Sequence, residues 1–193
     1  GGLTLVSRLD SPTSGVMTLA LGGDRSGAAH WLKAQFAARR VSKEYLCLCA
    51  GRPLGPVGSE DEIDIPLLVT EGWCEGPRAV PSSSGKEART RYRVTEVFDR
   101  PDQADVLTLA VARPRTGRTH QIRAHLAAIG RPLVGDEVYG EVAAAGGVQC
   151  SRLFLHCWRI ALLDLAGARF EVEASLPADL QGALSQLRRR SSA

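Results

Sequence analysis

The chain has 193 residues, of which 44% are hydrophobic and 23% charged, a composition typical of one soluble globular domain. No run approaches the roughly 18 apolar residues that a membrane-spanning helix needs, so we expect no membrane association. The five cysteines lack short repeated spacing, which argues against a disulfide framework or a zinc site and favours a reducing compartment. Cytoplasm, nucleus and organelle remain open as locations.

The predicted secondary structure mixes strands and helices along the chain. Strands are expected over residues 3–6, 15–21, 45–50, 88–98, 106–112, 155–163 and 169–174. Helices are expected over residues 24–39, 119–129 and 177–189, and surface loops over the Gly-, Pro- and Ser-rich segments 51–61 and 70–85. These elements predict an α+β fold with a mixed, mainly antiparallel sheet and flanking helices.

Residues two apart on a strand point to the same face. Cys47 and Cys49 are therefore expected together in the core rather than as a pair of metal ligands. Phe170 and Val172 alternate with glutamates, a pattern that predicts a half-buried antiparallel strand.

The basic residues are unevenly distributed, although the net charge of +3 would not by itself indicate nucleic acid. Residues 25–43 and 106–135 contain no acid and carry five basic side chains each, and both windows flank the motifs described next. A third feature is the spacing of Arg89, Arg91 and Arg93, which puts all three on one face of a strand. That face either follows a phosphate backbone or is a solvated basic edge that discourages aggregation.

A lone acid stands in a turn near the start of the chain. Residues 8–15 read RLDSPTSG and lie between two apolar stretches that are both expected to be strands. The small and turn-forming residues predict a loop that displays Asp10 at a strand end.

A second segment, residues 113–123, reads RPRTGRTHQIR and follows an expected strand. Its proline and glycine predict a turn, after which a helix begins at Thr119. His120 and Arg123 share one face of this helix, while an apolar stripe that includes Ile122 anchors the other. Such a helix start suits anions.

Both segments resemble signature motifs of the RluA-type pseudouridine synthases, enzymes that isomerise uridine in RNA. Further blocks also resemble that family, in the same order: KEY at 43–45, GRTHQIRAHL at 117–126, GDEVYG at 135–140 and FLH at 154–156. The resemblance spans roughly residues 6–180. It departs from the family at Ser7, where the usual residue is His.

The resemblance implies three catalytic residues. Asp10 is the carboxylate that attacks C1′ of the ribose or acts as a base at C2′, and Arg123 is its salt-bridge partner, whose guanidinium can hold two carboxylate oxygens. Tyr45 is placed beside the base, where it stacks on the uracil or moves a proton, and the sequence does not decide between these roles and plain core packing.

The resemblance also implies RNA contacts. Arg8 would fill the space that a flipped uridine leaves. Four further residues are candidates either for phosphate and base contacts or for bracing the helix start: Arg118, Thr119, His120 and Gln121. The remaining motif histidines are interpreted as structural, because His125 lies on the apolar side of its helix and His156 lies in a strand. The alternative, a metal hydrolase built from His120, His125 and His156, is disfavoured because no Asp or Glu accompanies them at the spacing of a metal site.

The expected function is that of an isomerase, a pseudouridine synthase acting on ribosomal, transfer or another structured RNA. Breaking the C1′–N1 bond of uridine and rejoining the base through C5 demands no cofactor and no metal. We expect a monomer. The alternative is a catalytically inactive RNA-binding relic of the same fold.

Domain organisation follows from the same resemblance. In the family, the segment before the catalytic loop supplies further strands and a helix. Residues 1–193 are therefore expected to be the larger, C-terminal part of a single catalytic domain, and the alternative is a complete small domain.

Overall fold

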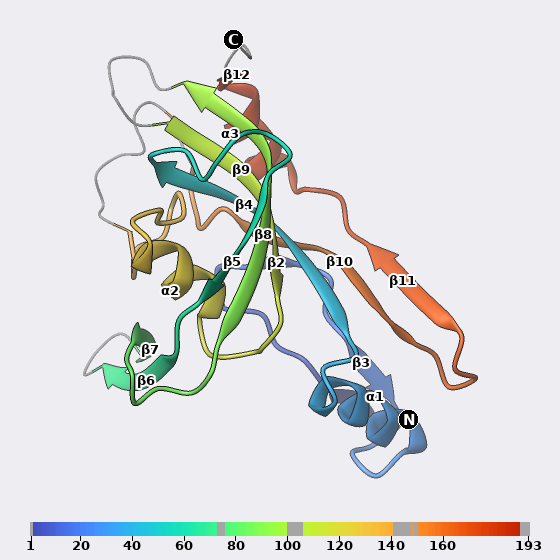
Figure 1. Cartoon of the computed structure of the whole chain (residues 1–193). Helices are drawn as coiled ribbons and strands as arrows, with labels where there is room; N and C mark the ends of the chain where they lie inside the picture. Colours follow the sequence, from blue (N-terminus) through green and yellow to red (C-terminus); the bar gives the residue numbers. More distant parts are fainter. Residues whose placement is uncertain (1, 73–75, 100–105, 141–147, 149, 190–193) are drawn as a thin grey trace.

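The computed structural model describes residues 2–72, 76–99, 106–140, 148 and 150–189. Its centre is an eight-stranded sheet in which β11, β10, β4, β9, β8 and β12 are neighbours in that order, with β2 beside β10 and β5 beside β8 (Figure 1). The strands are β2 (Ser14–Gly15), β4 (Ser42–Gly51), β5 (Glu60–Asp64), β8 (Arg89–Asp99), β9 (Val106–Pro114), β10 (Leu155–Leu163), β11 (Arg169–Glu173) and β12 (Arg188–Arg189). Among the strands of the described residues, only the β2–β10 pairing is parallel, so the predicted α+β fold with a mainly antiparallel sheet is confirmed.

The two faces of the sheet carry separate apolar cores. On β4, Cys47 and Cys49 face one core, which includes Leu126 of helix α2 (Gln121–Ala128). Leu48 faces the other core, which includes Leu180 of helix α3 (Ala178–Ser185). The expectation that both cysteines lie in the core is confirmed. Each fully buried leucine contributes roughly 1.5–3 kcal/mol to folding, so α2 is firmly fixed on the face where the site lies.

Two smaller sheets and one helix complete the molecule. Strands β1 (Leu3–Leu5) and β3 (Leu19–Leu21) form an antiparallel ribbon beside helix α1 (Gly27–Ala37), and β6 (Leu67–Gly72) pairs with β7 (Gly76–Pro81). Helix α1 is tied to the end of β10 through Gln35, whose amide donates to and accepts from the backbone of Leu163.

Several predicted boundaries were wrong. The expected strand 15–21 is two short pieces, β2 and β3, because Gly15 pairs with β10 whereas Leu19–Leu21 pairs with β1. The expected loop 70–85 contains most of the β6–β7 hairpin, and the expected loop 51–61 overlaps the ends of β4 and β5.

The helices are shorter than expected, each for a local reason. Ser26 caps α1 by accepting a hydrogen bond from the Ala29 N–H, so α1 begins after it. His120 has a left-handed backbone, with φ of 49°, so α2 begins at Gln121. Helix α3 ends at Ser185, and Arg188–Arg189 pairs with β8 instead of continuing it.

The strand expected at residues 169–174 is present as β11 and is antiparallel to β10, as predicted. Its predicted burial was wrong, because every residue of β11 is exposed and neither face, including that of Phe170 and Val172, is covered. Strand β11 is an edge strand that pairs only with β10 among the described residues, and no helix covers it (Figure 1). None of the helices in the described ranges combines the length and apolar character needed to cross a membrane.

Candidate active site

Residues 8–15, the Asp10 loop, are held close to strand β10. A turn is closed where the Thr13 N–H donates to the carbonyl of Asp10 at 2.8 Å, and the Val16 N–H donates to the carbonyl of Cys157. Gly15 has a φ of 123°, and a Cβ added there would stand 2.2 Å from the Cys157 carbonyl oxygen. Only glycine fits this close approach.

Two side chains anchor the far end of the loop. His156 Nε2 lies 3.0 Å from the Ala174 carbonyl, which can only accept, so this nitrogen carries the proton and Nδ1 accepts from the Ser14 hydroxyl at 2.9 Å. Arg152 donates to the Pro12 carbonyl and to Asp179 of α3. The hydrogen bonds of His156 agree with a structural role for this residue. Together with the contacts of Arg152, they fix the loop against the sheet.

Ser7, the residue that departs from the family pattern, is tied to the chain after the loop. Its hydroxyl lies 2.8 Å from the Thr18 hydroxyl and accepts a hydrogen bond from the Thr18 N–H. The start of the loop is therefore held although the histidine is absent.

The turn before α2 is braced by Gln121. Its carbonyl oxygen accepts from the Thr116 hydroxyl at 2.7 Å and from the Arg118 N–H, and its amide nitrogen donates to the Arg89 carbonyl and the Thr90 hydroxyl. All the hydrogen-bonding groups of this buried amide are occupied within the protein. These bonds brace the turn in the protein without RNA, and contact of Gln121 with RNA stays a prediction.

One guanidinium lies between two carboxylates. Arg123 donates two hydrogen bonds to Asp136, from Nε at 2.9 Å and from Nη2 at 2.7 Å. Its Nη1 lies 3.6 Å from Oδ2 of Asp10. The expected ion contact between Asp10 and Arg123 is present, but the two-point grip predicted for Asp10 belongs to Asp136.

Asp136 is completely held by its surroundings. Its side chain is inaccessible to solvent and also accepts from the N–H groups of Val138 and Tyr139. Burial alone lowers the pKa of Arg123, but the hydrogen bonds and charge of Asp136, with a contribution from Asp10, raise it overall. The Asp10 carboxylate, by contrast, forms no hydrogen bond with the described residues and is about one-quarter exposed.

Tyr139 links this arrangement to the β6–β7 hairpin. The Ala79 N–H of β7 donates to the Tyr139 hydroxyl at 2.7 Å, and Arg78 donates to the carbonyl of Val138. The guanidinium groups of Arg78 and Arg123 both lie over the Tyr139 ring, 5.5 and 5.2 Å from its centroid. The hairpin is thus docked on the residues that hold Arg123.

Burial shifts the pKa of two groups near Asp10. The pKa of the Tyr45 hydroxyl is raised far above its ordinary value, first by burial and then by Cys157 and Asp10. The pKa of His120 is lowered, chiefly by burial, against the opposing charge of Asp10. Both side chains are therefore neutral at pH 7, and His120 Nδ1 lies 3.3 Å from the Tyr139 hydroxyl.

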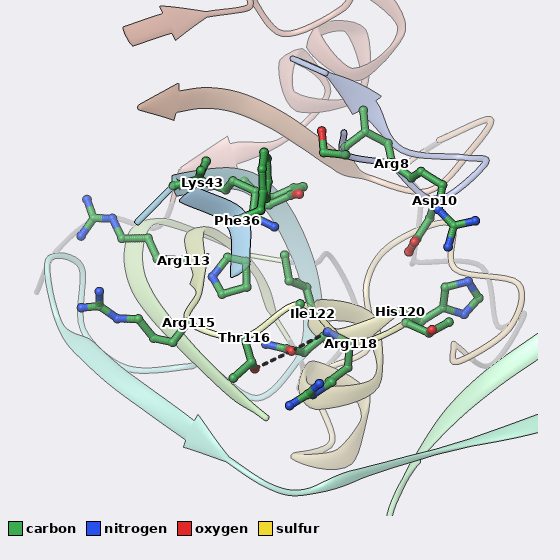
Figure 2. Close-up of a pocket in the computed structure, with 18 of the residues that line it drawn as sticks. Arg8, Asp10, Phe36, Lys43, Arg113, Arg115, Thr116, Arg118, His120 and Ile122 are labelled. Atoms are coloured by element: carbon green, nitrogen blue, oxygen red, sulfur yellow. Dashed lines mark hydrogen bonds between the residues drawn. The ribbon is translucent and has the colours of Figure 1, made fainter. Parts of the chain in front are cut away.

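These elements enclose a cavity of about 940 Å3. Figure 2 shows Asp10, Arg8 and His120 on one side of it and Arg113 and Arg115 on the other. The sequence-predicted residues that line the cavity are Arg8, Asp10, Tyr45, Arg118, Thr119, His120 and Gln121, and Arg123 lies behind Asp10. The structure therefore brings all eight predicted residues together, while their roles stay a prediction.

The arginine face of β8 lies where the sequence placed it, and two of its three arginines are paired with acids. Arg89, Arg91 and Arg93 are exposed and alternate with buried residues. Strand β5 sets an acid opposite each of them, with Asp64 at 3.1 Å from Arg89 and Glu62 at 3.1 Å from Arg91. Two of the three arginines are therefore held in surface ion pairs, whereas Glu60, opposite Arg93, lies 3.8 Å from Arg113 instead.

The other motif histidine is held in the core. His125 is fully buried, and its ring nitrogens lie 2.9 Å from the Thr90 hydroxyl and the Ile65 carbonyl. Within the described ranges, no three His, Cys, Asp or Glu side chains converge as metal ligands.

Sequence reasoning missed Asp136, Tyr139 and Arg78. The first two belong to the GDEVYG block at 135–140, which was recognised without roles. The glycine at position 135 was the available signal of a turn, and in the structure its backbone is left-handed, with a φ of 72°. Arg78 lies in a segment expected to be a loop, and its spacing carried no signal.

Comparisons with known proteins agree with this geometry. Residues 2–128 match the family model described as RNA pseudouridylate synthase. The chain belongs to this family. It is 37% identical to an uncharacterized RNA pseudouridine synthase of Chloroflexus aurantiacus over 97% of its length, and 38% identical to the dual-specificity RNA pseudouridine synthase RluA of Escherichia coli over 78%.

A solved structure shares the fold. The chain superposes on human RNA pseudouridylate synthase domain containing 1 with a TM-score of 0.79 and 28% identity, covering 98% of this chain and 75% of that one. The chain spans 54% and 63% of the lengths of its relatives from C. aurantiacus and E. coli.

Proposed function

We propose that this chain carries the catalytic site of an RNA pseudouridine synthase, an isomerase that converts uridine to pseudouridine in structured RNA. The observation that carries the proposal is the Asp10 carboxylate, which lies in a basic cavity with its oxygens unbonded and a guanidinium 3.6 Å away. A carboxylate held in this way is charged and oriented, yet free to meet a substrate.

The proposed reaction begins when a uridine is flipped out of the RNA into the cavity. Asp10 attacks C1′ or removes a proton at C2′, and the C1′–N1 bond breaks. The uracil turns and C5 bonds to C1′, which breaks the bond between Asp10 and C1′ in the first route or is accompanied by return of the proton to C2′ in the second, and the C5 proton then leaves. No atom is gained or lost, because the C5 proton goes to solvent and N1 takes up another.

Each neighbour has a proposed part in this sequence. Arg123 holds Asp10 in place and is itself fixed by Asp136. Tyr45 lies beside the base, where its neutral hydroxyl donates a hydrogen bond rather than acting as a phenolate. Arg8, which is exposed at the rim, fills the space left by the flipped uridine.

The test is release of tritium from RNA labelled at C5 of uridine. The wild-type chain should release tritium, and Asp10→Asn should reduce release to background while RNA affinity stays nearly unchanged. Asp24→Asn is the matched control, since Asp24 is exposed and lies outside the cavity. Equal release by wild type and Asp10→Asn would refute the assigned role, and a large loss of RNA affinity would make Asp10 a binding residue.

The same assay addresses the remaining proposals. We propose that the chain acts as one domain and as a monomer, because its described residues bring Asp10, Arg123 and the basic side chains of the cavity together within one fold. We also propose that no metal takes part, so a chelator such as EDTA should leave tritium release unchanged. Loss of release with EDTA, or release only at concentrations where light scattering detects dimers, would contradict these proposals.

A further inference from the structure

The cavity extends well beyond Asp10. Its volume of about 940 Å3 lies at the upper end of the range of roughly 300–1,000 Å3 typical of small-molecule sites. In Figure 2, Arg113 and Arg115 lie across the cavity from Asp10. There is consequently room for more of an RNA strand than a single flipped uridine.

The wall of the cavity carries many more positive charges than are needed to balance the single negative charge of Asp10. Asp10 is the single acid among its lining residues, which include seven basic side chains: Arg8, Arg39, Arg40, Lys43, Arg113, Arg115 and Arg118. Arg113 is compensated by Glu44 at 3.1 Å. Within the described ranges, the guanidinium groups of Arg40 and Arg115 form no hydrogen bond or ion pair, and both residues are exposed.

One of these arginines, Arg39, has a strained backbone conformation. Helix α1 ends in a Schellman motif, with the Arg40 N–H donating to the Gln35 carbonyl and the Arg39 N–H donating to the Phe36 carbonyl. The left-handed position of this motif usually holds glycine, but here it holds Arg39, with a φ of 55°. Its ion contact within the protein is weak, 3.9 Å to Glu87, a carboxylate that Arg89 also contacts.

We propose that Arg39, Arg40 and Arg115 form a phosphate-binding rim for the RNA strand next to the flipped uridine. The rim binds phosphodiester groups at the end of the cavity opposite Asp10, so the strand runs from the end of α1 past the turn at 113–118. This inference rests on the proposed function for its ligand, single-stranded or looped-out RNA. Strain at a left-handed arginine is expected where its side chain serves binding.

The first test is the salt dependence of binding to an oligouridylate, followed by fluorescence anisotropy. Each phosphate contact contributes about −0.7 to the slope of log affinity against log salt for a single strand. Arg40→Gln and Arg115→Gln should each weaken binding and reduce that slope by about 0.7. Arg52→Gln, an exposed arginine outside the cavity, should leave it unchanged. Rim variants with the wild-type slope would overturn the proposal.

A second test locates the phosphate. Neutral methylphosphonate replaces one linkage of the oligouridylate at a time, and the affinity of each RNA is measured. One or two linkages should weaken binding to the wild type but not to the Arg40→Gln/Arg115→Gln double variant. If every linkage has the same effect on both proteins, the rim does not hold the backbone.

Arg39 gives a test in which stability and binding move in opposite directions. Arg39→Gly should raise Tm by about 2–4 °C, because glycine relieves the left-handed strain, and should weaken RNA binding with a smaller salt slope. Arg40→Gln, at an ordinary backbone conformation, should leave Tm unchanged. A higher Tm with undiminished RNA binding would mean that Arg39 has no role in binding and does not belong to the rim.

The rim and the proposed function fail in different ways. If tritium release depends on Asp10 while the rim variants keep the wild-type slope, the rim is wrong and the function stands. If no tritium is released but the rim variants lower the slope, the chain binds RNA through the rim without catalysing the reaction.

Discussion

At the scale of single residues, the main feature of the site is that Arg123 binds Asp136 much more closely than Asp10. Asp136 takes two short hydrogen bonds and is inaccessible to solvent, whereas Asp10 has one contact at 3.6 Å and no hydrogen bond to the described residues. Asp136 therefore neutralises the guanidinium and fixes its position. Arg123 in turn lies close enough to orient Asp10, while the Asp10 oxygens keep no hydrogen bond to the described residues. A nucleophile bound as tightly as Asp136 would have to break those bonds to react.

Asp136→Asn should therefore be costly to stability and activity together. Removing one partner of a buried ion pair costs about 3–5 kcal/mol, because the other charge stays buried. Urea unfolding should show a loss of this size, and tritium release should fall as Arg123 loses its orientation. Glu62→Gln is the control, because the half-exposed pair of Glu62 with Arg91 is worth about 0–1 kcal/mol. A loss for Asp136→Asn no larger than for the control would refute the anchoring role.

At the scale of elements, the site is built from loops that rigid strands hold in place. The Asp10 loop is fixed by β10, by His156 and by Arg152, and the turn before α2 is fixed by Gln121. The β6–β7 hairpin reaches the same place through Tyr139. Each loop therefore has its own anchor on the sheet, which fixes the position of the side chains that line the cavity.

Gly15 is the position where the Asp10 loop is most sensitive to an added side chain. Gly15→Ala combines a left-handed φ with a Cβ 2.2 Å from the Cys157 carbonyl, so it should lower the free energy of unfolding by more than about 1 kcal/mol and reduce tritium release. Gly23→Ala, which meets nothing within 4 Å, should change neither quantity. Both quantities are measured by urea unfolding and by the tritium assay. Wild-type values of both for Gly15→Ala would contradict the prediction, because they would mean that the loop is not disturbed.

The sequence predicted the elements that carry strong local patterns and missed those that depend on distant contacts. Periodicity predicted the strands and the face of α2 that carries His120, whereas the family resemblance of the motifs placed Tyr45 and Asp10 at the same site, and all three residues line one cavity. The β6–β7 hairpin was predicted as a loop because its Pro- and Ser-rich composition hides a pairing that docking on Tyr139 supports. The grip of Asp136 on Arg123 joins a turn to a helix, and no residue spacing reports such a contact.

At the scale of the whole molecule, the central sheet has an apolar core on each face. The cavity lies at the end of the face that packs against α2, called the α2 face. The α2 face is close-packed around buried polar side chains as well as apolar ones, including His125 and Thr90. Buried polar groups that are fully hydrogen-bonded specify one arrangement of α2 on the sheet, but they also make that arrangement depend on protonation.

His125 should make folding stability sensitive to acid. Burial lowers the pKa of His125 below its ordinary 6.5 in the folded protein. As the pH falls through about 6.5, the unfolded chain takes up a proton before the folded protein does. The contribution of His125 is thus complete above that pH and is lost as the pH falls toward the folded-state pKa, at up to about 1.4 kcal/mol per pH unit.

Urea unfolding measured from about pH 7.5 down to about pH 5.5 checks this, with the slope of unfolding free energy against pH as the readout. His125→Gln keeps a hydrogen-bonding side chain but cannot titrate, so its slope should be flatter than that of the wild type even if its stability is lower throughout. His30→Gln, at an exposed position on α1, should retain the wild-type slope. Identical slopes for wild type and His125→Gln would mean that His125 is not the acid-sensitive group, and that the attachment of α2 withstands its protonation.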